Sequence, residues 1–329
     1  MPKKIKILYP RLLEDLDNTN HSCPTLEKIL RKSRMFNKKY YGHEDEIRLL
    51  LTGYQDPSEA PPLASLMANF DLEHQITTPI ISADPVHLRA DKNRVYLFDS
   101  SSFAIKIEEA EEMISSLNNF FEKDSIEFFL GKSPYRWYLK GLDTFPFNLP
   151  SPSMMAGLPL EYSANEMLTC NKLKTIFSEI QMILFSLPLN SVREKQGHVS
   201  INSVWFWGGG QWNFNLKKNS TVITDCEILQ ACCQASSVHL IKFQLNDSED
   251  KHLENMAQNL YIGFSNLGDS RSAAQRLKFV ESLLEENREN RLLNVELITN
   301  LKVFKFNYFS KLKFWKTNRA IKDFAKINY

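Results

Sequence analysis

Residues 179–210 read EIQMILFSLPLNSVREKQGHVSINSVWFWGGG, and this stretch passes from a helical pattern to a strand and then to three glycines. Apolar residues at helical spacing predict a helix over Ser163 to Phe185, and Pro188 ends it. The run from Ser200 to Trp207 predicts a buried strand in the main sheet, with the glycines at its carboxyl end. A helix that leads into a buried strand is typical of α/β proteins.

The three glycines have two interpretations. Because Gly208, Gly209 and Gly210 have no side chains, their backbone N–H groups can closely approach an anion. The usual phosphate-binding loop continues directly into a helix, whereas the sequence QWNFN that follows here has no helical pattern. The alternative is a tight turn that allows the neighbouring tryptophans to pack.

On both sides of this stretch, strand patterns alternate with helix patterns, which favours an α/β fold with a mainly parallel sheet. The expected strands are residues 3–9 and 238–245. The expected helices are one that Pro24 opens at its first turn, one over residues 225–235 and one over residues 272–289.

A different pattern occupies the middle of the chain. Strands are expected at Pro79 to Ser82 and at residues 94–98, then a helix over 107–121, then strands over 126–130 and 135–139. This β-β-α-β-β order predicts a small α+β lobe, which ends in a proline-rich segment. We therefore expect three parts. These are residues 1–78 as the N-terminal part of the α/β core, 79–150 as a substrate-type lobe, and 151–329 as the rest of the core.

Composition excludes several classes of protein. The 329 residues contain no apolar run of the length that spans a membrane and no signal-peptide pattern. A Gly-rich dinucleotide fingerprint is absent, which argues against a Rossmann oxidoreductase. Five cysteines without paired spacing indicate reduced thiols and hence a cytoplasmic protein.

The C-terminal segment is strongly basic. From Leu301 onward there are eight Lys or Arg and one Asp, so the last 29 residues carry a net charge of +7. Lysines interleaved with aromatics are compatible with nucleic acid or an anionic membrane surface. Alternation of Phe304 and Phe306 with Lys305 favours instead a strand with a buried face, so nucleic acid is an unlikely partner.

Short motifs resemble the archaeal-type cofactor-independent phosphoglycerate mutases of the alkaline-phosphatase superfamily. The run from Pro188 through Asn190, Arg193, Gly197 and Asn202 to the glycines is similar to a His-Pro-Val-Asn-x-x-Arg stretch that is followed by an Asn, a strand and Arg-Gly-x-Gly. Here a leucine replaces the histidine and a tryptophan replaces the second arginine. The segment DPVHLRAD, the acidic helix EEAEE and the strand that contains Tyr-Arg-Trp resemble the family's substrate lobe. These similarities cover roughly residues 80–210.

The whole chain more specifically resembles a bacterial family labelled RpfE-type regulatory or phosphoglycerate-mutase-like proteins of unassigned activity. The strings that carry this resemblance are DPVHLRAD, EIQM and INSVWFWGGG. It implies a reduced alkaline-phosphatase-like fold.

The metal ligands of the mutases have no counterpart in this sequence. The resemblance implies two divalent metals held by an early Asp, a nucleophilic Ser, an Asp-x-x-x-His and an Asp-His pair. After the first strand this chain has Leu8-Tyr9-Pro10 where the family has Asp-Gly, and it contains no Asp-His dipeptide. The nearest alternative, Asp247 to His252, has the wrong spacing. We therefore expect no metal and no cofactor, and we assign no catalytic residue.

Candidate ligand-binding residues lie within the resembling segments. Arg89, Arg136 and Arg193 predict a clamp for a phosphate or carboxylate, close to Asn190 or Asn202 and the glycines. Unrelated surface or ion-pair arginines are the alternative.

The histidine of the DPVHLRAD segment is a second candidate. Asp84 and His87 suit acid–base chemistry, or else a loop histidine beside a turn-capping aspartate.

Three functions follow. The favoured one is a regulatory or ligand-binding protein for a small phosphorylated or carboxylated compound. The others are an active mutase or phosphatase with rearranged metal ligands, and a nucleic-acid or membrane-surface module that uses the basic tail.

Overall fold

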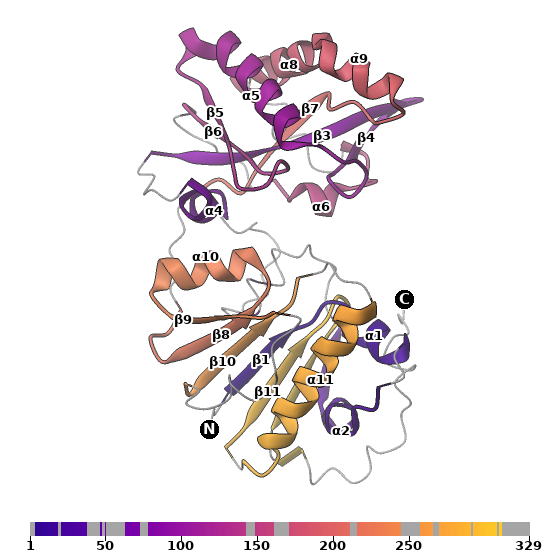
Figure 1. Ribbon diagram of the computed structural model, residues 1–329, viewed down its shortest axis with the longest axis vertical. Coiled ribbons are helices and arrows are strands. Elements are labelled where there is room, and N and C mark those ends of the chain that lie inside the picture. The colour runs from indigo at the N-terminus through magenta and orange to yellow at the C-terminus, as the bar shows by residue number, and fades with distance from the viewer. Residues whose placement is uncertain are drawn as a thin grey trace. The chain divides into compact units, whose positions relative to one another are not determined.

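The computed structural model describes residues 4–18, 21–37, 47, 50, 63–72, 78–142, 149–160, 171–210, 216–244, 257–265, 270–290, 292–307 and 309–310. The chain divides into two compact units (Figure 1). Unit 1 comprises residues 1–55 and 215–329, and unit 2 comprises residues 56–214. The expected lobe, 79–150, therefore lies in unit 2, which also takes in residues 56–78 and 151–214 that the sequence had suggested for the core.

A seven-stranded sheet forms the centre of unit 1 (Figure 1). Neighbouring strands are parallel except in the two pairs that β12 makes. In spatial order the strands are β2 (Arg34–Asn37), β12 (Lys302–Asn307), β11 (Asn294–Ile298), β1 (Lys4–Leu8), β10 (Asn259–Gly263), β8 (Ser220–Thr224) and β9 (His239–Lys242). The mainly parallel α/β sheet predicted from the sequence is confirmed.

Helices cover the sheet because its central strands are buried on both faces. Ile5 and Ile7 of β1 lie in one apolar core with residues of α1 (Leu12–Asn18), α2 (Pro24–Lys32) and α11 (Ser270–Glu286). These three helices lie together on one face (Figure 1). A further helix, α10 (Glu227–Ser236), connects β8 to β9. The predicted first strand and the helices near Pro24, 225–235 and 272–289 are confirmed.

Unit 2 is built on an antiparallel sheet (Figure 1). Its strands are β4 (Arg94–Phe98), β3 (Ile80–Asp91), β6 (Trp137–Lys140) and β5 (Glu127–Leu130), with β7 (Ser203–Trp207) also paired with β3. Its helices are α4 (Leu63–Leu72), α5 (Ile107–Phe121), α6 (Pro152–Met155), α8 (Asn171–Ser186) and α9 (Pro188–Lys195), with a 3-10 turn at Glu122–Asp124. The predicted β-β-α-β-β order of elements is confirmed as β3, β4, α5, β5 and β6.

The position of β7 corrects one prediction. This strand is buried along its whole length, but it pairs antiparallel with β3 in unit 2 rather than with the main parallel sheet. The sequence SVWFW is apolar on both faces of the strand, so it predicts a buried strand but does not indicate which of the two sheets the strand joins. Pro188 also does more than end a helix, because it occupies the first turn of α9, where the missing N–H costs nothing.

The described part of the basic tail is a sheet strand. In β12, Phe304 and Phe306 are buried while Lys305 is exposed, as the alternation predicts. Two strands of unit 1, β11 and β2, flank it. Residues 311–329 lie outside the described residues.

Candidate functional site

Asp84 and His87 make bonds within the protein itself. The Asp84 carboxylate accepts hydrogen bonds from the backbone N–H of Trp137 at 3.1 Å and from the indole N–H of Trp207 at 2.7 Å, and so ties β3 to β6 and β7. His87 Nδ1 lies 2.8 Å from the carbonyl oxygen of Ser200, so this nitrogen donates a proton. Asp84 therefore joins three strands, and His87 joins β3 to the loop before β7.

The two candidate asparagines act as substitutes for backbone pairing. Asn190 Nδ2 donates to the carbonyls of Leu184 at 2.7 Å and Ile201 at 2.8 Å, and its Oδ1 accepts from the Ile201 N–H at 2.9 Å. Asn202 pairs through both amide atoms with the N–H and C=O of Leu88, at 2.8 and 2.9 Å. A side-chain amide that binds both groups of one residue fixes the path of the loop before β7.

Each of the three candidate arginines has its own partner. Arg136 binds Asp71 through two hydrogen bonds of 2.9 and 2.7 Å. Arg193, 1% exposed, binds Glu109 at 2.7 Å and two backbone carbonyls. The guanidinium of exposed Arg89 lies 4.8 Å from the ring centroid of Phe98. Arg136 and Arg193 therefore each form an ion pair within the protein, and a ligand clamp stays a prediction.

The glycine loop lies against the start of α4. The Gly208 carbonyl accepts from the N–H of Ala64 at 2.9 Å, and the Gly210 carbonyl accepts from the Ser65 hydroxyl at 3.3 Å. Gly208 has φ +65° and Gly210 has φ +118°, which favours glycine at both. A tight turn therefore follows β7, and anion binding by the loop N–H groups stays a prediction.

The carboxyl ends of the parallel strands hold a second group of polar residues, in unit 1. Ligands of open α/β sheets gather at this edge. Asp225 follows β8, and its carboxylate accepts from Arg276 Nη2 and from the backbone N–H of Ser265, both at 2.6 Å. Arg276 also donates to the Ser265 carbonyl at 3.2 Å and lies 5.3 Å from the Phe264 ring centroid. Its side chain is 7% exposed.

A phenol follows the central strand β1. The Tyr9 hydroxyl lies 2.9 Å from Asp15 Oδ2 and 3.3 Å from the carbonyl oxygen of Ala273. Burial, with the Asp15 charge beside it, raises the pKa of the Tyr9 hydroxyl far above its usual value. The phenol therefore stays protonated and holds α1 and α11 against the strand end.

These side chains do not fit the pair of divalent metals that the resemblance implies. Divalent cations need ionised carboxylates or neutral imidazoles. At this edge Asp225 is already paired with a guanidinium, whose charge repels a metal ion, and protonated Tyr9 is a poor ligand. Within the described ranges, no group of three or more His, Cys, Asp or Glu has metal-binding geometry. The alternative at Asp247 to His252 lies outside the described residues.

The arrangement of the two sheets defines the class of protein, and solved structures of similar fold are known. It is a two-unit α/β protein with a mainly parallel sheet and a separate antiparallel sheet. Its structure is similar to the PH0037 protein from Pyrococcus horikoshii, with a TM-score of 0.53 and 11% identity, over 93% of this chain and 87% of that chain. A cofactor-independent phosphoglycerate mutase from Thermoplasma acidophilum DSM 1728 aligns with a TM-score of 0.44 and 14% identity, over 93% and 90% of the two chains.

At these identities the comparisons concern the fold and not the activity. No protein-family model and no curated protein matches the sequence. Among the described helices, none has both the length and the apolar character needed to cross a membrane.

The polar residues at the sheet edge were not predicted from the sequence. Asp225 directly follows STVIT, a β-branched run that predicts a strand and was overlooked. Recognition of that strand would have placed Asp225 at a carboxyl end. Its partner Arg276, 51 positions later, has no local signal in the sequence.

Proposed function

We propose that the protein is an alkaline-phosphatase-like regulatory protein that binds a small phosphorylated or carboxylated compound without phosphoryl transfer. The observation that carries the proposal is the Arg276–Asp225 ion pair at the carboxyl edge of the parallel sheet. A two-metal mechanism requires cations there to stabilise the attacking and leaving oxygens. In this chain the guanidinium of Arg276 is paired with the Asp225 carboxylate instead.

A link to RpfE-type regulatory proteins, and a bacterial origin, belong to the same proposal. They are supported by the strings DPVHLRAD and INSVWFWGGG. The regulatory role is supported by the combination of a retained fold and a donor set that does not suit metals. A cytoplasmic location is supported by the buried free thiols of Cys23, Cys226, Cys232 and Cys233.

The test measures metal content and turnover in one preparation. Purified protein is dialysed against manganese, its bound metal is counted by mass spectrometry, and conversion of 3-phosphoglycerate is followed. We expect less than one tightly bound manganese per chain and no conversion. Two bound manganese ions together with turnover would overturn the proposal and establish an active enzyme with rearranged ligands.

A nucleic-acid role is disfavoured by the two phenylalanines of β12. In proteins that bind single-stranded nucleic acid, the bases stack on exposed aromatic rings. Phe304 and Phe306 are only 1% and 7% exposed, so these two rings cannot stack on bases.

A further inference from the structure

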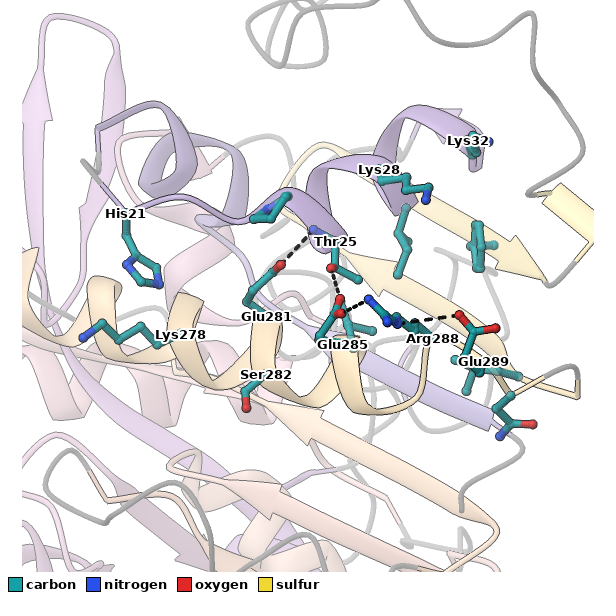
Figure 2. Close-up of a pocket in the computed structure, with 16 residues that line it drawn as sticks. His21, Thr25, Lys28, Lys32, Lys278, Glu281, Ser282, Glu285, Arg288 and Glu289 are labelled. Carbon is teal, nitrogen blue, oxygen red and sulfur yellow. Dashed lines mark hydrogen bonds and ion pairs between the residues drawn. The ribbon is translucent and has the colours of Figure 1, made fainter.

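A cavity of about 810 Å³ lies between α2 and α11 in unit 1 (Figure 2). Small-molecule sites in proteins have volumes of roughly 300–1,000 Å³. Its location differs from that of the sheet-edge pair. Arg276, in the N-terminal half of α11, reaches the carboxyl edge, while Lys278 and the residues after it line the cavity.

The cavity combines an apolar floor with a charged rim. Ile29, Leu284, Leu293 and Phe306 line it and are at most 7% exposed. A ligand with an apolar body would remove its own apolar surface from water against this floor, which is favourable.

Two carboxylates in the lining are already bound. Both Glu281 oxygens accept backbone N–H groups at the start of α2, from Thr25 and Leu26, each at 2.8 Å. Glu285 accepts from the Thr25 hydroxyl and from Arg288 (Figure 2). The Thr25 hydrogen bond, together with the Arg288 charge, lowers the pKa of Glu285, so this carboxylate stays ionised and engaged.

Two of the lysines on the rim make no such bonds. Lys28 and Lys278 are exposed, and within the described part of the chain neither forms a hydrogen bond or an ion pair. In Figure 2, Lys278 lies near His21 toward one end of the labelled residues, and Lys28 lies near Lys32 toward the other. The negative charge of the lining is therefore directed at α2 and Arg288, while ammonium groups at the rim are available to an anion from solution.

We propose that this cavity binds a small organic anion, a phosphate or carboxylate attached to an apolar body, with the anionic group at one of the two rim lysines, Lys28 or Lys278, and the body on the apolar floor. This inference rests on the proposed function and adds to it the place and the chemical class of the ligand. An inorganic anion lacks the apolar body, and a neutral compound lacks the charge. Each should therefore bind more weakly than an organic anion that has both.

Phenyl phosphate is the probe, with inorganic phosphate and phenol as comparisons. In heteronuclear NMR spectra of the full chain, phenyl phosphate should shift the imidazole signals of His21, which lines the cavity, and leave those of exposed His239 unchanged. Binding should weaken as salt is raised, because the lysines are exposed.

The matched variants are Lys28→Glu with Lys278→Glu, and Lys218→Glu as a control on an exposed lysine of unit 1 outside the cavity. The double variant should bind phenyl phosphate at least about tenfold more weakly, and the control should bind normally. Unchanged denaturation curves confirm that all variants fold. Equal affinity in the double variant, or no shift at His21, would overturn the inference. Hydrolysis of phenyl phosphate would instead overturn the proposed function.

Discussion

Arg193→Met tests whether the motif that resembles the mutases is structural in this chain. The Arg193 guanidinium donates to the Val199 carbonyl at 3.0 and 2.9 Å, to the Ala104 carbonyl at 2.7 Å and to the Glu109 carboxylate at 2.7 Å. Methionine keeps the apolar stem but leaves these acceptors without their donor. Removal of one partner of a buried pair costs about 3–5 kcal/mol, so we expect the free energy of unfolding to fall by about that amount.

The assay is urea denaturation followed by tryptophan fluorescence, with Arg89→Met as the control. Arg89 is exposed and meets only the Phe98 ring in the described contacts, so its loss should cost no more than about 1 kcal/mol. Glu109→Gln combined with Arg193→Met should recover part of the lost stability, because the unpaired charge is gone. If Arg193→Met costs less than about 1 kcal/mol but abolishes phenyl phosphate binding, Arg193 is a ligand residue and our reasoning is refuted.

Three further substitutions test other parts of the fold by the same method. Burial lowers the pKa of Lys6 to about 8, so the unfolded chain binds the extra proton between pH 8 and 10.5 and stability rises with pH there. Lys6→Met should abolish that rise, about 3 kcal/mol, and a retained rise would contradict the assignment. Phe304→Ala should cost about 3–5 kcal/mol, against no more than about 1 kcal/mol for Lys305→Ala, which removes only a half-exposed ion pair with Glu296; equal costs would mean that β12 does not pack. Asp71→Ala should cost about 3–5 kcal/mol, because Arg136 and Tyr138 share that buried carboxylate; a neutral effect would exclude this network.

The sequence predicted the elements whose pattern is local. The helix at Ile107–Phe121 and the strand at Arg94–Phe98 have the predicted bounds, because amphipathic spacing and strand alternation are properties of neighbouring residues. The order of elements was sufficient for the fold class. It was not sufficient for β7, whose partner β3 lies more than a hundred positions earlier.

The roles of the candidate site residues were less predictable, because each role depends on a partner that is distant in the sequence. The sequence identified Arg136 and Arg193 as side chains that can bind anions, and anions do bind both. They are the protein's own carboxylates, Asp71 at a separation of 65 positions and Glu109 at 84. A single sequence does not distinguish an arginine kept for a ligand from one kept for a remote carboxylate.

The discontinuity of unit 1 has a consequence for the order in which the chain folds as it is made. Unit 2 is complete once residue 214 has emerged from the ribosome. The first strand, β1, lies between β10 and β11, so it waits for partners that begin at Asn259. At translation speeds of about 5–20 residues per second, that delay is roughly ten to fifty seconds. The most N-terminal strand therefore joins its sheet after the middle of the chain has folded, which reverses the usual vectorial order. During that interval the apolar segment around Ile5 and Ile7 is a natural target for chaperones.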